Sequence, residues 1–268
     1  MFKSFYGLTF NPFDKSIAEN YAFSSNDHKQ MLSRLDHLKN TRGIGLFTAI
    51  PGMGKTFTLR CFAQNLNPNL FQLSYICLST VSVMEFYQQF CHELGLDYGS
   101  KKSIMFRNIQ ERLLHLLKEK RKTFILTIDE SQYLSHQVLR DIKMLMNTNF
   151  DSLDCFTLIL IGQPHLGSIL ERPIHEALKQ RIVIHYKYEG LSLEESKNYI
   201  YTRIELAGAS CTIIDEAAVH AVINFSKGAP RIINNVMSNS LILGAQLKKN
   251  KIDTEIIMSV CNELSLCS

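Results

Sequence analysis

The chain contains seven cysteines but no Cys-x-x-Cys pair of the kind that holds structural zinc, and the cysteine count is odd. It lacks the run of about 18 apolar residues that a membrane-spanning helix needs. Its first residues lack the apolar core of a signal peptide. No internal repeat is evident. These absences argue against a disulfide framework, a zinc site or a transmembrane helix, and we expect a cytoplasmic protein with reduced thiols.

The composition allows one large domain or two small ones, since the chain has 268 residues, of which 46% are hydrophobic and 20% charged. The formal net charge of +4 is mildly basic. Such a charge permits binding to nucleic acid but does not require it.

A glycine-rich stretch, TAIPGMGKTF at residues 48–57, matches the phosphate-loop pattern G-x-x-x-x-G-K-[ST] except that Ala49 replaces the first glycine. Gly52 and Gly54 let backbone N–H groups face phosphate oxygens, and Lys55 adds a positive charge. An ordinary turn between a strand and a helix is the alternative. We expect a nucleoside triphosphate to be bound by Pro51, Gly52, Met53, Gly54, Lys55, Thr56 and Phe57.

Apolar runs predict five strands, at residues 43–49, 70–79, 123–130, 155–164 and 181–188. Helical patterns lie between most of these strands, which predicts an α/β fold with a mostly parallel sheet. From Leu191 the pattern is helical only, and Ser192 with Glu195 predicts a capping box. We therefore expect an α/β nucleotide-binding domain at residues 1–190, with 1–27 as an extension, and a helical lid at 191–268.

The third predicted strand ends in two carboxylates, Asp129 and Glu130. Together with a phosphate loop, this arrangement is typical of nucleotide hydrolysis. We expect Asp129 and the Thr56 hydroxyl to hold Mg²⁺. Glu130 is the expected general base for the attacking water. The alternative is an ordinary strand that ends in acidic residues.

Two further side chains suit a triphosphate enzyme. Gln163 ends the fourth predicted strand, where its amide can reach the γ-phosphate or the water; the alternative is a structural amide at the start of a loop. Arg231 follows a Gly-Ala-Pro turn at a helix start, where it can contact the γ-phosphate; the alternative is a surface arginine.

Eight segments together resemble the AAA+ ATPases, in the branch that includes the ExeA-like ATPases and the transposition regulators of the TnsC, TniB and MuB type. They are YGLTFNPF (6–13), GMGKT (52–56), IDESQYLS (128–135), NTNFDS (147–152), LILIGQPHL (158–166), QRI (180–182), LSLEESKNYIYTRIELAG (191–208) and GAPRIINN (228–235).

This resemblance implies an AAA+ fold with a five-stranded parallel sheet and a C-terminal helical lid. It also implies a homo-oligomer, either a ring or a helical filament, with ATP at the subunit interfaces. Gln163 then becomes the first sensor residue and Arg231 the second. The arginine that reaches the neighbour's nucleotide would be Arg181, or else Arg172, although Arg181 could also be a charge at a strand edge. Relatives often carry an acid where this chain has His165.

The two branches of the family imply different functions for the ATPase. ExeA-like proteins continue into a membrane span and a cell-wall-binding domain, and neither is found before Ser268. We therefore expect an ATP-dependent regulator of transposition that assembles on double-stranded DNA and recruits a transposase, with a target-selection protein as a further partner. The alternative is an ExeA-like ATPase that acts on a secretion or membrane-associated partner. A scaffold that binds nucleotide without hydrolysis is a third hypothesis, and Glu130 argues against it.

DNA binding would need positive charge that faces the channel of such an oligomer. Lys101, Lys102 and Arg107 lie in and after a polar connection where relatives place residues that contact DNA. Lysines there would bind phosphates without regard to base sequence. The alternative is a solvated loop.

Overall fold

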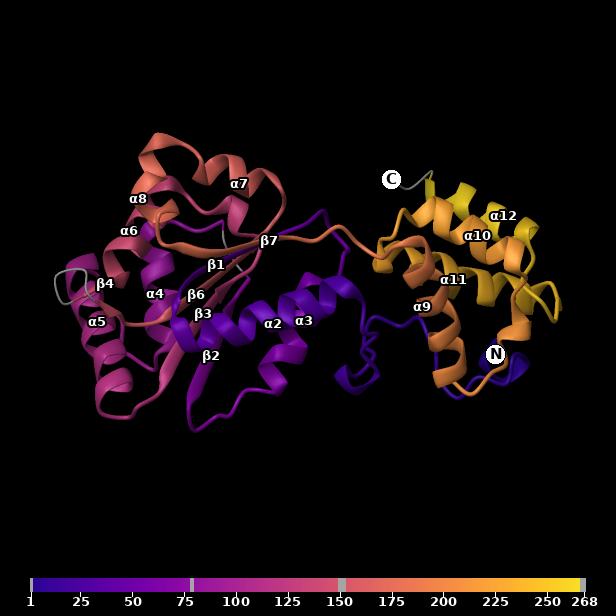
Figure 1. Cartoon of the computed structure of the whole chain (residues 1–268), viewed down its shortest axis with the longest axis horizontal. Helices are drawn as coiled ribbons and strands as arrows, with labels where there is room; N and C mark the ends of the chain where they lie inside the picture. Colours follow the sequence, from indigo (N-terminus) through magenta and orange to yellow (C-terminus); the bar gives the residue numbers. More distant parts are fainter. Residues whose placement is uncertain (1, 78–79, 149–152, 266–268) are drawn as a thin grey trace. The chain divides into compact units, whose positions relative to one another are not determined.

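The computed structural model describes residues 2–77, 80–148 and 153–265. The chain forms two compact units, which are labelled by element in Figure 1. The sheet unit comprises Gln30–Pro51 and Thr58–Tyr188. The helical unit comprises Met1–Lys29, Gly52–Phe57 and Glu189–Ser268.

The sheet unit is built on five parallel strands in the order β2-β3-β6-β1-β7. The strands are β1 (Gly43–Thr48), β2 (Phe71–Ile76), β3 (Thr123–Ile128), β6 (Thr157–Gly162) and β7 (Ile182–Lys187). Nearly every residue of the three central strands is buried, as expected when helices cover both faces of a parallel sheet. The α/β fold with a five-stranded parallel sheet is confirmed.

Helices pack on both faces of this sheet. They are α2 (Asn26–Thr41), α3 (Lys55–Gln64), α4 (Val83–Glu93), α5 (Lys102–Lys118) and α6 (His136–Met146). Ile44 and Leu46 of β1 share one apolar cluster with buried residues of α4, α5 and α6. The opposite face of β1 contacts α2 at Gly45, where an added Cβ would lie 2.5 Å from Leu38 Cδ2. Glycine therefore permits the close approach of α2 to the sheet.

Several short elements were not predicted from the sequence. They are η2 (Ser131–Tyr133), β4 (Asn147–Thr148), β5 (Leu153–Asp154), α7 (His165–Leu170), η3 (Pro173–His175) and α8 (Glu176–Lys179). β4 and β5 pair antiparallel in a separate two-stranded sheet. Most of the NTNFDS segment, residues 149–152, lies outside the described residues. Elements of two to six residues carry too few apolar positions to show a period in the sequence.

The helical unit is formed mainly by α9 (Leu193–Leu206), η4 (Cys211–Ile213), α10 (Glu216–Ser226), α11 (Pro230–Gln246) and α12 (Thr254–Ser265). The predicted capping box at the start of α9 is confirmed, because Ser192 and Glu195 bond to each other's backbone N–H groups. Glu195 also accepts a hydrogen bond from Asn26 N at 2.6 Å.

The N-terminal residues, with α1 (Phe2–Phe5) and η1 (Glu19–Tyr21), pack on these helices. Tyr6, Leu8 and Phe13 are buried in the same apolar cluster as α10, α11 and α12. Tyr6 Oη donates to Lys249 O at 2.9 Å, and burial raises the pKa of this phenol to about 12. The segment expected to extend the α/β domain is thus grouped with the C-terminal helices. Within the described ranges, no helix is both long enough and apolar enough to cross a bilayer.

Candidate functional site

The phosphate loop follows β1 directly and leads into α3, which begins at Lys55. Gly52 has φ +87° and Gly54 has φ +98°, a region of backbone conformation that favours glycine. The Lys55 side chain is buried, with 9% of its surface exposed. Strand, loop and helix therefore occur in the order that the pattern requires.

Within the helical unit, this loop contacts the start of α11. Arg231 N donates to Gly52 O at 3.2 Å, and a Cβ added at Gly52 would lie 2.9 Å from Arg231 Cβ. Met53 is buried, and its Sδ lies 2.8 Å from the position of a Cβ added at Gly190. The structure therefore brings Arg231 together with the phosphate loop, although the two are far apart in sequence.

The loop fits the phosphates of a nucleotide. A Cβ added at Gly54 would meet no heavy atom within 4 Å, so this side of the loop is open. The N-terminus of a ten-residue helix carries partial positive charge, which favours an anion there. Lys55 is the second residue of the Gly-Lys-Thr run and begins that helix.

The end of β3 carries the two predicted carboxylates. Asp129 is buried, with 6% of its surface exposed, and its backbone N–H extends the ladder by donating to Ile76 O at 2.9 Å. Its Oδ1 accepts from Glu130 N at 2.8 Å. Glu130 is exposed and has φ 50° and ψ 37°, a left-handed conformation that residues other than glycine adopt mainly where structure or function demands it.

Tyr75 of β2 is a neighbour of Asp129 that the sequence did not reveal. Its Oη donates to Asp129 Oδ2 at 2.7 Å. Burial and this hydrogen bond raise the pKa of the Tyr75 phenol. The register pairs Tyr75 with Thr127, two residues before Asp129, which places all three side chains on one face of the sheet. A sequence gives no such register, so the contact could not be found from it.

Gln163 follows β6, the strand between β3 and β1. The ends of these three parallel strands lie at one edge of the sheet, which brings Gln163 close to the carboxylates. Gln132 links them: its Nε2 donates to Glu130 Oε2 at 2.6 Å, and its Oε1 accepts from Gln163 N at 3.1 Å. Gln132 lies within the IDESQ run, but the sequence did not identify it as a site residue.

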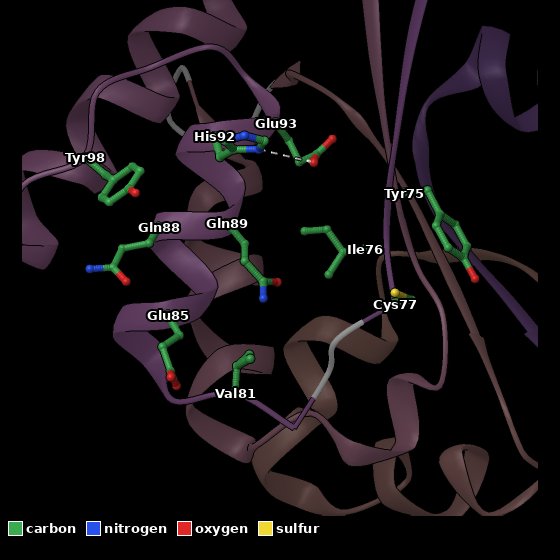
Figure 2. Close-up of a pocket in the computed structure, with 10 residues that line it drawn as sticks. All are labelled: Tyr75, Ile76, Cys77, Val81, Glu85, Gln88, Gln89, His92, Glu93 and Tyr98. Atoms are coloured by element: carbon green, nitrogen blue, oxygen red, sulfur yellow. Dashed lines mark ion pairs between the residues drawn. The ribbon is translucent and has the colours of Figure 1, made fainter.

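A pocket of about 440 Å³ opens between the end of β2 and α4. In Figure 2, Glu85, Gln88 and Gln89 project from α4, and Ile76 points toward Gln89 from β2. None of the described residues that line this pocket is Lys or Arg. It therefore lacks the positive charge that triphosphate binding requires.

Both candidate arginines lie in the sheet unit and have partners there. Arg181 Nη1 forms an ion pair with Asp154 Oδ1 at 2.9 Å. Arg172 Nη1 lies 3.2 Å from His136 Nε2. These contacts hold both side chains within one chain and do not decide which of them reaches a neighbour.

The three candidate DNA contacts lie on or next to α5, which begins at Lys102. Lys101 is exposed and precedes the helix. Lys102 forms an ion pair with buried Asp141, and Arg107 Nε lies 3.8 Å from Glu111 Oε1. Two of the three cations are therefore already next to carboxylates, which weakens an electrostatic attraction for DNA phosphates.

Three comparisons with known proteins bear on this geometry. A family model described as "AAA domain" matches residues 38–170. The general secretion pathway protein A of Aeromonas hydrophila is 30% identical over 255 residues, which are 94% of this chain and 46% of that protein. The chain therefore spans just under half the length of this curated relative.

Solved structures share the fold at low sequence identity. Cdc6p from Pyrobaculum aerophilum matches with a TM-score of 0.68 and 14% identity, over 90% of this chain and 67% of that one. Aeropyrum pernix ORC1, in complex with DNA, matches with a TM-score of 0.68 and 15% identity, over 94% and 68%. The RuvB Holliday junction branch migration motor of Thermotoga maritima matches with a TM-score of 0.60 and 20% identity, over 95% and 74%. At these identities the likeness concerns the fold alone.

Proposed function

Because the chain is an AAA+ ATPase of the branch that includes the ExeA-like proteins, we propose that it hydrolyses ATP to act on a protein partner in a secretion or other membrane-associated system. The observation that carries this proposal is the 30% identity to general secretion pathway protein A over 94% of the chain. The match spans residues of both units, so it includes the phosphate loop, the carboxylates and the C-terminal helices.

Nucleotide binding rests on the loop. Backbone N–H groups around Gly52 and Gly54 would bind phosphate oxygens, and Lys55 would place its charge on the β- and γ-phosphates. Arg231, which contacts the loop at Gly52, would respond to the γ-phosphate and so couple the nucleotide state to the C-terminal helices.

Hydrolysis rests on the end of β3. Glu130 would accept a proton from the attacking water as general base, and Gln163 would orient that water or the γ-phosphate. The Thr56 hydroxyl and the Asp129 carboxylate are the residues that would hold Mg²⁺. The ion would supply positive charge against the β- and γ-phosphate oxygens.

The expected role in transposition has less support. The named relative with the higher identity belongs to a secretion pathway, while the fold-level matches at 11–20% identity carry no function. Lys102 and Arg107, two of the three candidate DNA contacts, lie next to carboxylates of the same chain. We therefore propose the ExeA-like function and keep duplex DNA as a test of the other.

Assembly with other copies of the chain is part of the proposal. A site with one general base and no arginine from a neighbour would lack a charge that stabilises the transition state. We propose that Arg181, or in its place Arg172, supplies this charge to an adjacent subunit in a ring or filament. Because the proposed reaction consumes ATP, we propose that the protein acts in the cytoplasm.

The test is phosphate release by the purified chain with Mg²⁺ and ATP. Glu130→Gln should lower kcat by at least about 100-fold while a fluorescent ATP analogue still binds, because only the base is lost. Lys55→Ala should abolish binding of the analogue. Turnover that Glu130→Gln leaves unchanged would contradict the assigned chemistry.

A second arm of the test separates the two partner classes. Duplex DNA is added with ATP, with ADP and without nucleotide, at several salt concentrations. The ExeA-like function predicts no ATP-dependent binding and no stimulation of turnover. Binding that needs ATP, weakens with salt and is lost in Lys101→Ala/Lys102→Ala would overturn it in favour of the transposition regulator.

A further inference from the structure

Gln132 occupies a buried position between the two polar groups that end β3 and β6. It is the second residue of η2, directly after the Glu130–Ser131 step, and only 6% of its surface is exposed. A buried amide must satisfy both its donor and its acceptor atoms, or it destabilises the fold. The partners of its oxygen and of its NH₂ group therefore show which contacts this amide makes in the fold.

Both ends of this amide have a defined role. Gln163 N is a backbone N–H and can only donate, so the atom that lies 3.1 Å from it must be the oxygen of Gln132. The other atom is then the NH₂ group, which donates to Glu130 Oε2 at 2.6 Å. The orientation of the amide is thus fixed by its partners, and only a glutamine-like side chain meets both demands.

The donor end acts on the side chain that we propose as general base. Glu130 lies at the surface in a left-handed conformation, and its exposed carboxylate could otherwise adopt several rotamers. The hydrogen bond from the buried amide fixes the position of one carboxylate oxygen of Glu130. Because the two oxygens belong to one rigid group, this bond also restricts where the second oxygen can lie. The acceptor end attaches the same amide to the first residue after β6, whose side chain is the proposed γ-phosphate contact.

The space for this amide depends on a glycine. A Cβ added at Gly162 would lie 2.7 Å from Gln132 Oε1 and 2.8 Å from Leu166 Cδ2. The far end of the Gln132 side chain is the part that could move away. An alanine at this position would therefore displace the amide without removing any polar group.

We propose that Gln132 is a positioning residue for ATP hydrolysis, which holds the Glu130 carboxylate and the Gln163 backbone in one fixed arrangement. This inference rests on the proposed function. Gln132 contacts neither the reacting water nor the phosphates in the proposed chemistry, and it acts through Glu130. It should therefore affect kcat and leave nucleotide binding intact.

Three variants separate the two hydrogen bonds. Gln132→Met keeps the length of the side chain and removes both bonds. Gln132→Glu keeps an acceptor for Gln163 N but replaces the donor to Glu130 with an oxygen. Gly162→Ala displaces the amide by contact alone. Gln110→Met on α5 is the matched control, because it removes an amide hydrogen bond, to Asn147 O at 3.4 Å, away from the carboxylates.

The experiment measures phosphate release across ATP concentrations, together with binding of a fluorescent ATP analogue and thermal unfolding. We expect Gln132→Met and Gln132→Glu to lower kcat by about 10-fold to 100-fold, the effect of one lost hydrogen bond to a charged group. KM and the Kd of the analogue should stay within about twofold. Gly162→Ala should lower kcat by a smaller factor, and Gln110→Met should leave it unchanged.

A double-mutant cycle tests whether Gln132 acts through Glu130. In a Glu130→Gln background, Gln132→Met should cause no further loss of the residual turnover, since the base is already absent. Additive losses would overturn the inference, as would a Gln132→Glu variant with wild-type kcat. If Gln132→Met does not fold, Gln132→Glu and Gly162→Ala give the same reading. A wild-type chain without turnover would refute the proposed function itself, whereas wild-type turnover that these variants leave unchanged refutes only the role of Gln132.

Discussion

The two glycines of the phosphate loop both have positive φ but differ in their surroundings. A Cβ at Gly52 would lie 2.9 Å from Arg231 Cβ, whereas a Cβ at Gly54 would meet nothing within 4 Å. Alanine in the left-handed region costs about 1–2 kcal/mol in either case. We expect both Gly52→Ala and Gly54→Ala to weaken binding of a fluorescent ATP analogue by about tenfold or more, and only Gly52→Ala to cause a further loss of thermal stability.

Titration of the analogue and thermal unfolding measure these two effects separately. Gly167→Ala in α7 is the control, since it has open space and no positive φ. It should leave binding unchanged and could add helix stability of about 1 kcal/mol. Equal melting temperatures for Gly52→Ala and Gly54→Ala would mean that Arg231 does not hold the loop as described.

Residues in linear motifs were the ones that the sequence could predict. Lys55, Asp129 and Glu130 belong to short motifs next to a predicted strand or helix. Lys55 begins α3, and Asp129 and Glu130 follow β3, so their positions could be predicted from those elements. Tyr75 and Gln132 could not be found in this way. Their contacts depend on strand register and on how a buried side chain packs, and neither leaves a local pattern.

At the scale of elements, the N-terminal segment should stabilise the helical unit. Phe13 is 3% exposed and lies in the core cluster of the C-terminal helices. Phe13→Ala should lower the free energy of unfolding by about 3–5 kcal/mol, the usual cost of removing a buried phenyl ring. Denaturant unfolding of the full chain measures it, and Phe5→Ala, at a ring with 38% exposure, is the control. Similar effects for both would contradict the packing of this segment.

A histidine pair joins the start of α6 to η3. His136 Nδ1 lies 2.7 Å from His175 Nε2, and His175 is 2% exposed. Burial lowers the pKa of His175 from its ordinary 6.5, and the charges of His136, Arg140 and Arg172 lower it further. The unfolded chain therefore binds this proton at a higher pH than the folded one.

The sign of the pH dependence follows from this lowered pKa. Stability is fully present above pH 6.5 and falls as the pH drops through the window below it, because protonation favours the unfolded chain. We expect the melting temperature of the wild type to decrease from pH 7.5 to pH 5.5 more steeply than that of His175→Phe. Parallel decreases in the two proteins would exclude His175 as the group responsible.

The long elements were predictable and the short ones were not. Continuous apolar runs indicated the central strands because a parallel sheet buries both faces, and helical patterns indicated helices between most of the strands. Residues 1–27, which we expected as an extension of the α/β domain, are grouped with the C-terminal helices. Contacts such as Tyr6 with Lys249 join residues at opposite ends of the sequence, and local patterns do not encode them.

At the scale of the whole molecule, the sequence predicted the AAA+ fold, whereas the function expected from it, in transposition, differs from the ExeA-like function that we propose. A fold is inferred from many motifs along the sequence, so a wrong interpretation of one motif has little effect on the predicted fold. The expectation of DNA as a partner depended in part on a few cations, Lys101, Lys102 and Arg107. Lys102, for example, forms an ion pair with buried Asp141 of the same chain, and the sequence does not reveal this contact.

The proposed assembly can be tested through the arginine that acts between subunits. If Arg181 acts on the nucleotide of a neighbouring subunit, Arg181→Ala should lower turnover by about 10³-fold or more. The variant still has an intact Glu130, so its own site lacks only the arginine that a neighbouring subunit supplies. A Glu130→Gln subunit is also inactive but still carries Arg181. Mixing the two inactive variants should therefore restore part of the turnover. A site in an Arg181→Ala subunit has its own Glu130 and receives Arg181 from a Glu130→Gln neighbour, whereas the reverse interface lacks both groups.

Phosphate release during a titration of one inactive variant with the other measures this complementation. The same mixture made with Arg172→Ala decides between the two arginines, since only the residue that acts across the interface can be replaced by a neighbour. Arg181 also forms an ion pair with Asp154, so Asp154→Asn controls for loss of that contact alone. Both arginine variants could fold and bind the ATP analogue without recovering turnover in the mixture. That result would contradict the proposal that a neighbouring subunit supplies a catalytic arginine.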